Sequence, residues 1–247
     1  MERKIRVGAV SYLNTKPLVY GFENGEMKDE IELFFDYPAK IAAMLLNDEI
    51  DIGLIPVAVI PHLNEHYIIS DYCIGASQAV ASVCLFSDVP LKEIKEILVD
   101  YQSRTSAALL KILLKQHWKI SPALIDTNND YQQNIKGTTA GLVIGDRALE
   151  QRSHSKYIYD LAEAWITMTG LPFVFAAWVA NKKLSDEFTQ SFNKATSKGL
   201  NHIAEIVDTV KFREYNMNEY YTRNINYKLD DKKLEALQLF LGYLDEK

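Results

Sequence analysis

The sequence predicts a two-lobed α/β protein in which the chain crosses twice between the lobes. Short apolar runs alternate with helical patterns in two separate blocks, which is typical of parallel sheets with helices on their faces. Two further apolar strands, predicted over 81–86 and 173–180, bracket the second block. The chain therefore begins one lobe, builds a second and returns to the first.

The first third of the chain reads as strand, helix, strand, helix, strand. Each strand is a short apolar run, and both helices carry a proline in the first turn, where a missing N–H costs little. The predicted strands are 5–10, 31–36 and 50–54, and the predicted helices start at 15–20 and span 38–47. This order predicts a parallel sheet.

The middle of the chain repeats the pattern on a smaller scale. The expected strands are 97–99, 123–125 and 139–144, and the expected helices are 103–115 and a short one over 130–135. Before this block, residues 67–87 hold two extended segments. After it, 160–179 is an aromatic run of the kind that usually forms core, with a turn at 169–172 into the return strand. The rest of the chain is helical, over 185–206, 214–221 and 231–244.

A lobe that is interrupted by a second lobe and then resumed is the layout of bilobal, periplasmic-binding-protein-like proteins of type II. We expect one lobe to comprise 1–86 with 175–247, and the other 87–174. Such proteins bind a ligand between the lobes, near the ends of the parallel strands.

Composition narrows the function classes. The chain has 247 residues with 48% hydrophobic and 24% charged residues, which is ordinary for a globular protein. No apolar run reaches the roughly 18 residues that a membrane span needs. A net charge of −6 without a basic stripe argues against nucleic-acid binding. The first strand starts almost at once, without a secretory signal, so we expect a cytoplasmic protein.

The sequence argues against a metal-dependent mechanism and against a mechanism with a covalent intermediate. The 5 histidines and 2 cysteines show no ligand spacing, and we find neither a glycine-rich phosphate loop nor a nucleophile elbow. We therefore expect no cofactor and no metal. The sequence leaves the oligomeric state open.

Polar residues follow the first strand where it ends. They are Ser11, Tyr12 and Asn14. Asn14 can cap the helix that begins near residue 15, or it can contact a ligand. The two interpretations are compatible, because a helix N-terminus also binds anions.

A second polar run follows the strand 97–99 and opens the next helix. Ser103 is a natural N-cap, and Thr105 and Ser106 add hydroxyls and N–H groups in the first turn. The run is either a plain cap or a cradle for a carboxylate, to which Arg104 can add positive charge.

Two more residues stand at predicted strand ends. Ser82 lies on the first crossing strand, where it either bonds the backbone or contacts a ligand. Asp146 follows Gly145, a residue that permits close backbone approach. Asp146 can cap the following helix or accept a hydrogen bond from a substrate hydroxyl.

Six segments together resemble one family, the MqnA group of menaquinone-biosynthesis proteins, which are chorismate dehydratases. The similarity runs in register from about residue 5 to 179 and is weaker over 221–229. The segments are GAVSYLNTKPL, DIGLIPVAVI, SVCLFS, DYQSRTSAALLKILL, VIGDRAL and DLAEAWITMTGLPFVFAAWVA. One departure stands out, since Gln78-Ala79-Val80 occupies the place where we expect a Gly-Pro pair in relatives.

The resemblance implies that chorismate loses water to give 3-[(1-carboxyvinyl)oxy]benzoate. On this hypothesis Asn14 and Ser82 are the catalytic pair, and the substrate's own side-chain carboxylate removes the proton. Ser103, Thr105 and Ser106 hold a carboxylate. Asp146 is a less important contact with the substrate. Ser11, Tyr12 and Arg104 complete the expected substrate-binding set.

Two alternatives remain beside this hypothesis. A sister group of lyases forms 1,4-dihydroxy-6-naphthoate from cyclic dehypoxanthine futalosine and uses a pocket histidine, which the motifs of this chain lack. The other alternative is a non-catalytic protein that binds a small anion. A transport receptor would carry a signal, and a sensing domain would follow a DNA-binding helix-turn-helix. The sequence shows neither, which favours the enzyme.

Overall fold

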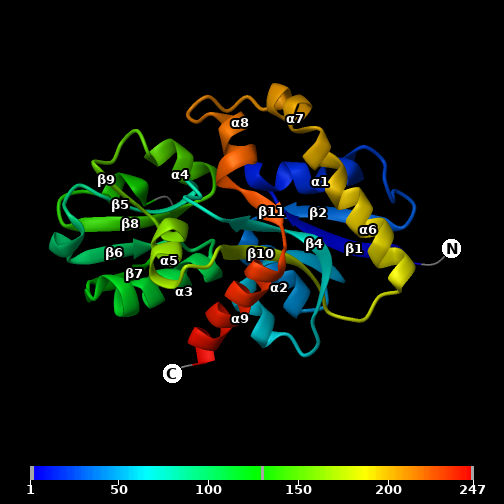
Figure 1. The fold of residues 1–247 in the computed structure, drawn as a ribbon, viewed down its shortest axis with the longest axis horizontal. Coiled ribbons are helices and arrows are strands. Elements are labelled where there is room, and N and C mark those ends of the chain that lie inside the picture. Colours follow the sequence, from blue (N-terminus) through cyan, green and yellow to red (C-terminus); the bar gives the residue numbers. More distant parts are fainter. Residues whose placement is uncertain (1–2, 129–130, 246–247) are drawn as a thin grey trace.

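The computed structural model describes residues 3–128 and 131–245, which form two lobes side by side (Figure 1). The large lobe is built on a six-stranded sheet of order β11-β4-β10-β3-β1-β2, and the small lobe on a five-stranded sheet of order β7-β6-β8-β5-β9. The large-lobe strands are β1 (Ile5–Val10), β2 (Ile31–Asp36), β3 (Ile52–Pro56), β4 (Tyr67–Ala76), β10 (Phe173–Ala180) and β11 (Asn226–Lys228). The small-lobe strands are β5 (Val83–Ser87), β6 (Glu96–Val99), β7 (Ala123–Asp126), β8 (Thr139–Ile144) and β9 (Tyr157–Asp160).

Each sheet combines a parallel part with antiparallel strands. In the large lobe β1 is parallel to β2 and β3, while β10 is antiparallel to β3 and β4. In the small lobe β6 is parallel to β7 and β8, while β5 is antiparallel to β8 and β9. The fold is therefore α/β with mixed sheets, as the alternating pattern predicts.

Helices cover both sheets (Figure 1). In the large lobe and the C-terminal part they are α1 (Lys16–Glu23), α2 (Pro38–Leu46), α6 (Asp186–Lys198), α7 (Ile203–Thr209), α8 (Met217–Glu219) and α9 (Asp231–Asp245). In the small lobe they are α3 (Arg104–Ile112), α4 (Asp146–Gln151) and α5 (Leu161–Thr169). Short 3₁₀ turns are η1 (Leu13–Thr15), η2 (Val57–His62), η3 (Leu91–Glu93), η5 (Gln132–Asn134) and η6 (Gly199–Asn201), and π-helical turns are η4 (Leu113–Trp118) and η7 (Tyr220–Asn224). No helix in the described part of the chain is long and apolar enough to cross a bilayer.

The predicted elements of the first block are confirmed. Strands β1 and β2 have the predicted bounds, and β3 lies two residues later than predicted. Helix α1 carries Pro17 in its first turn, and α2 starts at Pro38. The predicted last helix is also present, as α9.

Other elements differ from the prediction. Strand β5 starts at Val83, so the first connection between the lobes runs through 77–82 as irregular chain. The short strands β9 and β11 were not predicted. The predicted helix 214–221 is the one-turn α8 followed by η7. The predicted helix 130–135 begins outside the described residues, and within them only the turn η5 forms.

The predicted long helix 185–206 is wrong because the chain breaks after α6. A Cβ at Gly199 would lie 2.1 Å from the backbone oxygen of Pro17 on α1, a separation that no side chain tolerates. The 3₁₀ turn η6 makes this close contact, and α7 starts only after His202, whose backbone is not helical.

The aromatic run between α5 and β10 is core, as predicted. Trp165 and Trp178 are fully buried, and the Trp165 ring meets those of Phe173 and Phe240 edge-on. Because Phe240 lies on α9, this cluster anchors the C-terminal helix, which packs on β10, η2 and α3.

Candidate active site

A cleft lies between the two lobes at the carboxyl ends of β1, β3 and β8 and at the start of α3. Its lining carries no ionisable acid or base apart from the phenol of Tyr12. The polar lining residues are Tyr12, Asn14, Ser82, Ser103, Thr105 and Ser106, and the remainder are Val10, Pro38, Pro56, Ile74, Val80, Val83, Ile144, Gly145, Phe175 and Ala176. The cleft is thus an apolar slot with amide and hydroxyl groups at fixed points.

The structure brings together six of the nine predicted site residues, namely the six polar ones in this lining. The other three lie elsewhere. Ser11 is exposed and donates its backbone N–H to Asp36 O at 3.0 Å. Arg104 is exposed and lines a separate cavity, and the Asp146 carboxylate accepts a hydrogen bond from Leu13 N of the other lobe.

Three hydroxyls of the lining accept hydrogen bonds from the protein. Ser103 Oγ accepts from Ser106 N at 3.0 Å, which caps α3. Thr105 Oγ1 accepts from Ala58 N at 3.1 Å, across the cleft. Ser82 Oγ accepts from the Tyr220 hydroxyl at 2.8 Å. Among the residues that the structure describes, none of these hydroxyls donates to a protein acceptor, so each retains its proton for a ligand.

Asn14 stands at the end of β1 with its backbone held in place. Its carbonyl accepts from the Tyr227 hydroxyl at 2.9 Å, and its Oδ1 accepts from Thr15 Oγ1 at 3.3 Å. The side-chain amide faces the cleft, where it can donate to a substrate oxygen.

The connection 77–82 presents Ser82 through an unusual backbone. Ala81 has φ +64°, a left-handed conformation that a non-glycine residue rarely adopts. Asp160 stabilises it, because Oδ2 accepts from Ala81 N at 2.8 Å while Oδ1 caps α5. Burial raises the pKa of Asp160 above its usual range, against four backbone N–H donors that lower it. The Asp160 carboxylate therefore holds both the connection that contains Gln78-Ala79-Val80 and the start of α5.

A buried ion pair fixes the turn before α3. The Asp100 carboxylate accepts from Arg147 Nη2 at 2.8 Å, from the Tyr131 hydroxyl at 2.9 Å and from Gln102 N at 2.9 Å. The Arg147 guanidinium also lies 5.5 Å from the centre of the Tyr101 ring. Ser103 and the N–H groups of the first turn of α3 are thereby held toward the cleft.

Contacts across the cleft join the lobes. The Tyr12 hydroxyl donates to Gln102 Oε1, and Leu13 N donates to Asp146 Oδ1 at 3.1 Å. Asp146 therefore bonds the turn η1 of the opposite lobe, while Gly145 is the N-cap of α4. Burial raises the pKa of Asp146 to about 6, opposed by the Leu13 N–H.

Gly145 is required at its position for two reasons. Its φ is +65° and its ψ is −146°, a combination that residues other than glycine avoid. A Cβ there would also lie 2.8 Å from the Tyr12 ring. The close backbone approach predicted from the sequence is thus an approach to Tyr12.

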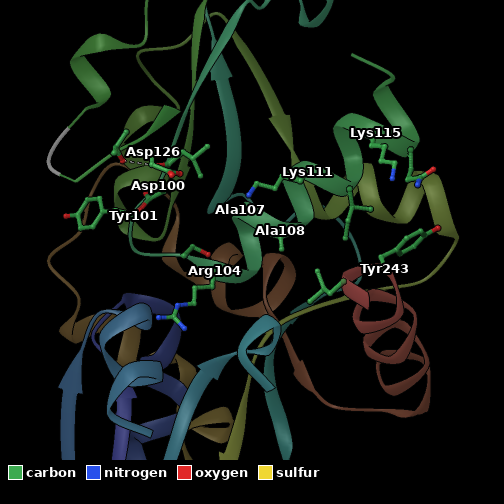
Figure 2. A pocket seen from close by; sticks show the side chains of 15 residues that line it. Asp100, Tyr101, Arg104, Ala107, Ala108, Lys111, Lys115, Asp126 and Tyr243 are labelled. Carbon is green, nitrogen blue, oxygen red and sulfur yellow. Dashed lines mark hydrogen bonds between the residues drawn. The ribbon is translucent and has the colours of Figure 1, made fainter. Parts of the chain in front are cut away.

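A second cavity, of about 660 Å³, lies on the outer side of α3 (Figure 2). Its lining includes Arg104, Lys111, Lys115 and, from α9, Tyr243. It contains none of the strand-end residues of the large lobe. We therefore place the candidate site in the cleft, although its free volume of about 50 Å³ is smaller.

Three side chains that hold the site together are not predicted by the sequence. Tyr220 and Tyr227 lie in the C-terminal segment, and Gln102 precedes α3. The weak family resemblance over 221–229 was the one available sign that this segment matters. Nothing in local spacing links a tyrosine at 220 to a serine at 82.

Two known enzymes are similar in sequence to nearly the whole length of this chain. Chorismate dehydratase of Thermus thermophilus is 23% identical over 258 residues, covering 95% of this chain and 93% of the relative. Chorismate dehydratase of Campylobacter jejuni is 29% identical over 246 residues, covering 95% of both.

Two solved structures show the fold. Protein AF1704 of Archaeoglobus fulgidus superposes with a TM-score of 0.80 at 15% identity, covering 98% of this chain and 97% of the other. A periplasmic aliphatic sulphonate-binding protein of Escherichia coli has a TM-score of 0.59 at 15% identity, covering 100% and 93%. The predicted periplasmic-binding-protein-like fold is confirmed. A family model described as menaquinone biosynthesis matches residues 5–246, and the chain belongs to this family.

Proposed function

We propose that this protein is a chorismate dehydratase, a carbon–oxygen lyase that converts chorismate to 3-[(1-carboxyvinyl)oxy]benzoate and water. Membership of the menaquinone biosynthesis family and two relatives of that name, matched over 95% of the chain, support the proposal. The observation that carries it is the cleft, whose hydroxyls are set as hydrogen-bond donors and which has no charged group in its lining.

The donors suit a dianionic substrate. A carboxylate accepts hydrogen bonds only, so it matches hydroxyls that already accept a bond from the protein and still have a proton to donate. The start of α3 adds N–H groups and the positive end of the helix dipole. Ser103, Thr105 and Ser106 hold one carboxylate there, and Ser82 donates to a carboxylate from the end of the connection 77–82.

The reaction needs orientation more than strong acid or base. The ring carbon that bears the enolpyruvyl ether loses its proton, and the neighbouring carbon loses hydroxide, so that one water leaves and the ring becomes aromatic. The C–H bond is allylic and conjugated with the ring carboxylate. Donors on that carboxylate stabilise the charge that develops as the proton departs. Asn14 orients the departing hydroxyl or a carboxylate.

The proton acceptor is the side-chain carboxylate of the substrate itself. The lining offers no protein carboxylate or histidine for this role, and the Asp146 carboxylate is bonded to Leu13 N. A single carboxylate or histidine variant that loses turnover yet binds chorismate normally would overturn this assignment.

Incubation of the purified protein with chorismate tests the function. We expect the diene absorbance to disappear and an aromatic product to form, with Asn14→Ala and Ser82→Ala reduced in kcat. Turnover of cyclic dehypoxanthine futalosine instead would assign the protein to the sister lyases. Tight binding of an anion without turnover would make it a binding protein.

We also propose that the protein acts in the cytoplasm, in keeping with its kinship to biosynthetic enzymes. Fractionation of cells that express the full gene, followed by immunoblotting, checks this proposal. Recovery in the periplasmic fraction would contradict it.

A further inference from the structure

The C-terminal segment contacts both proposed catalytic residues, and it holds Ser82 through a buried phenol. Tyr220 is completely buried at the first position of η7, and its hydroxyl donates to Ser82 Oγ at 2.8 Å. The partners are 138 residues apart in the sequence. Tyr220 does not line the cleft, so it acts on a ligand only through Ser82.

The buried Tyr220 phenol stays neutral. Burial raises the pKa of Tyr220 well above its usual range, and the contact with Ser82 opposes this increase only in part. A neutral phenol is therefore the form present at every physiological pH. It keeps a proton to donate and a lone pair to accept with.

The rest of the segment fixes the position of Tyr220. Asn224 Nδ2 donates to Ala79 O at 3.0 Å, and Gln78 Nε2 donates to Arg223 O at 2.8 Å. Both bonds tie η7 to the connection 77–82. Tyr227 bonds the Asn14 carbonyl, as described above, so the segment contacts both catalytic positions.

We propose that Tyr220 is a positioning residue that fixes Ser82 as a hydrogen-bond donor to the substrate. This inference rests on the proposed function. Because Tyr220 donates to Ser82 Oγ, the Ser82 proton turns toward the cleft. The bond from Tyr220 to Ser82 and the bond from Ser82 to the substrate strengthen each other. The Ser82 hydroxyl therefore becomes a stronger donor as charge develops on the substrate carboxylate.

The variant Tyr220→Phe tests the proposal by removing one oxygen from a site of unchanged shape. We expect kcat for chorismate to fall about tenfold and KM to change by less than about threefold, the loss of one hydrogen bond that matters most in the transition state. Tyr221→Phe is the matched control. Tyr221 is the next residue, equally buried, and its hydroxyl has no partner among the described residues. Its removal should leave kcat unchanged.

A double-mutant cycle with Ser82→Ala separates positioning from a structural role. If Tyr220 acts through Ser82, Tyr220→Phe causes no further loss of kcat in the Ser82→Ala background. A purely structural phenol would reduce kcat by the same factor in both backgrounds, which would overturn the proposal. Wild-type kcat in Tyr220→Phe, or an equal loss in Tyr221→Phe, would overturn it too. A wild-type protein that does not turn over chorismate would instead refute the proposed function, and this role with it.

Discussion

The half-buried carboxylate of Asp146 bonds the two lobes together through Leu13 N. Its partner is a backbone N–H, that of Leu13, and its pKa of about 6 reflects burial that one neutral donor does not offset. The group is therefore ionised at neutral pH at a cost to the folded state.

Replacement of Asp146 by Asn should remove the pH dependence that this carboxyl group gives to the free energy of unfolding. The folded-state pKa of about 6 lies above the ordinary 3.8. A raised pKa means that the contribution of the group to stability is complete below the unfolded value and is lost as the pH rises through about 6. The difference corresponds to about 3 kcal/mol. Asp146→Asn should therefore be more stable than wild type at about pH 8, and the gain should vanish near pH 4.

Urea unfolding of both proteins at the two pH values measures the effect. The control is Asp208→Asn, which removes an exposed carboxylate from α7 without any hydrogen bond or ion pair recorded for it in the described structure. A difference between wild type and Asp146→Asn that is the same at both pH values would contradict the prediction.

At the residue scale, the sequence predicts what lies near in the chain. Ser103, Thr105 and Ser106 share a helix start, and they line the cleft together. Asp146 was expected to cap its own helix or contact substrate, but its carboxylate bonds η1 of the other lobe. Contacts between lobes depend on how the lobes meet, which local spacing does not encode.

At the element scale, the start of α3 combines a structural cap with a binding role. Ser103 is the N-cap of α3, and Ser185 is an equivalent N-cap of α6 that bonds Phe188 N at 3.2 Å far from the cleft. Each Ser→Ala change should lower the free energy of unfolding by about 1 kcal/mol. Ser103→Ala alone should also raise KM for chorismate, by about fivefold.

Thermal unfolding and steady-state kinetics of the two variants measure both effects. Ser185→Ala thus reports the cost of losing a cap without losing a cleft donor. Equal KM values in Ser103→Ala and Ser185→Ala would show that Ser103 is a cap only.

Asp160 links two elements, because its two oxygens serve α5 and the connection 77–82. Asp160→Ala should lower the free energy of unfolding by about 2–4 kcal/mol, which is the loss of a cap plus a buried N–H at Ala81 left unpaired. It should also reduce kcat, since Ser82 follows Ala81 directly. Urea unfolding and kinetics, with Ser185→Ala as the cap-only control, measure these effects. A loss of stability no larger than in Ser185→Ala would contradict the shared role.

Elements were predicted well where their pattern is long and were missed where it is short. The strands Tyr157–Asp160 and Asn226–Lys228 have four and three residues, too few to show a period. The helix over 185–206 has a helical pattern throughout, but packing of Gly199 against α1 interrupts it. Tertiary packing of this kind overrides local preference.

At the scale of the whole molecule, the cleft is too narrow to admit a substrate as it stands. Its free volume is about 50 Å³, whereas small-molecule sites span about 300–1,000 Å³. The contacts Tyr12–Gln102, Leu13–Asp146 and Ala58–Thr105 all hold the lobes together. We therefore expect the lobes to separate for the proposed substrate to enter, by a hinge at the two connections.

Tyr12→Phe should shift this equilibrium toward the open form. The change deletes one hydrogen bond between the lobes and keeps the ring that packs against Gly145. A loss of about 1 kcal/mol from the closed form alone should raise KM for chorismate about fivefold and increase the radius of gyration without substrate. Saturating chorismate should restore the wild-type radius, because the ligand favours the closed form.

Small-angle scattering with and without chorismate, together with kinetics, tests this expectation. Tyr67→Phe is the control, since among the described residues that hydroxyl bonds Glu65 alone, at 3.2 Å, within the large lobe. It removes the same atom without touching the lobe contact. If Tyr12→Phe matched Tyr67→Phe in radius and in KM, the Tyr12–Gln102 bond would contribute nothing to closure. The Leu13–Asp146 and Ala58–Thr105 contacts would then stabilise the closed form. Because the pKa of Asp146 is raised to about 6, closure of the lobes would then depend on pH.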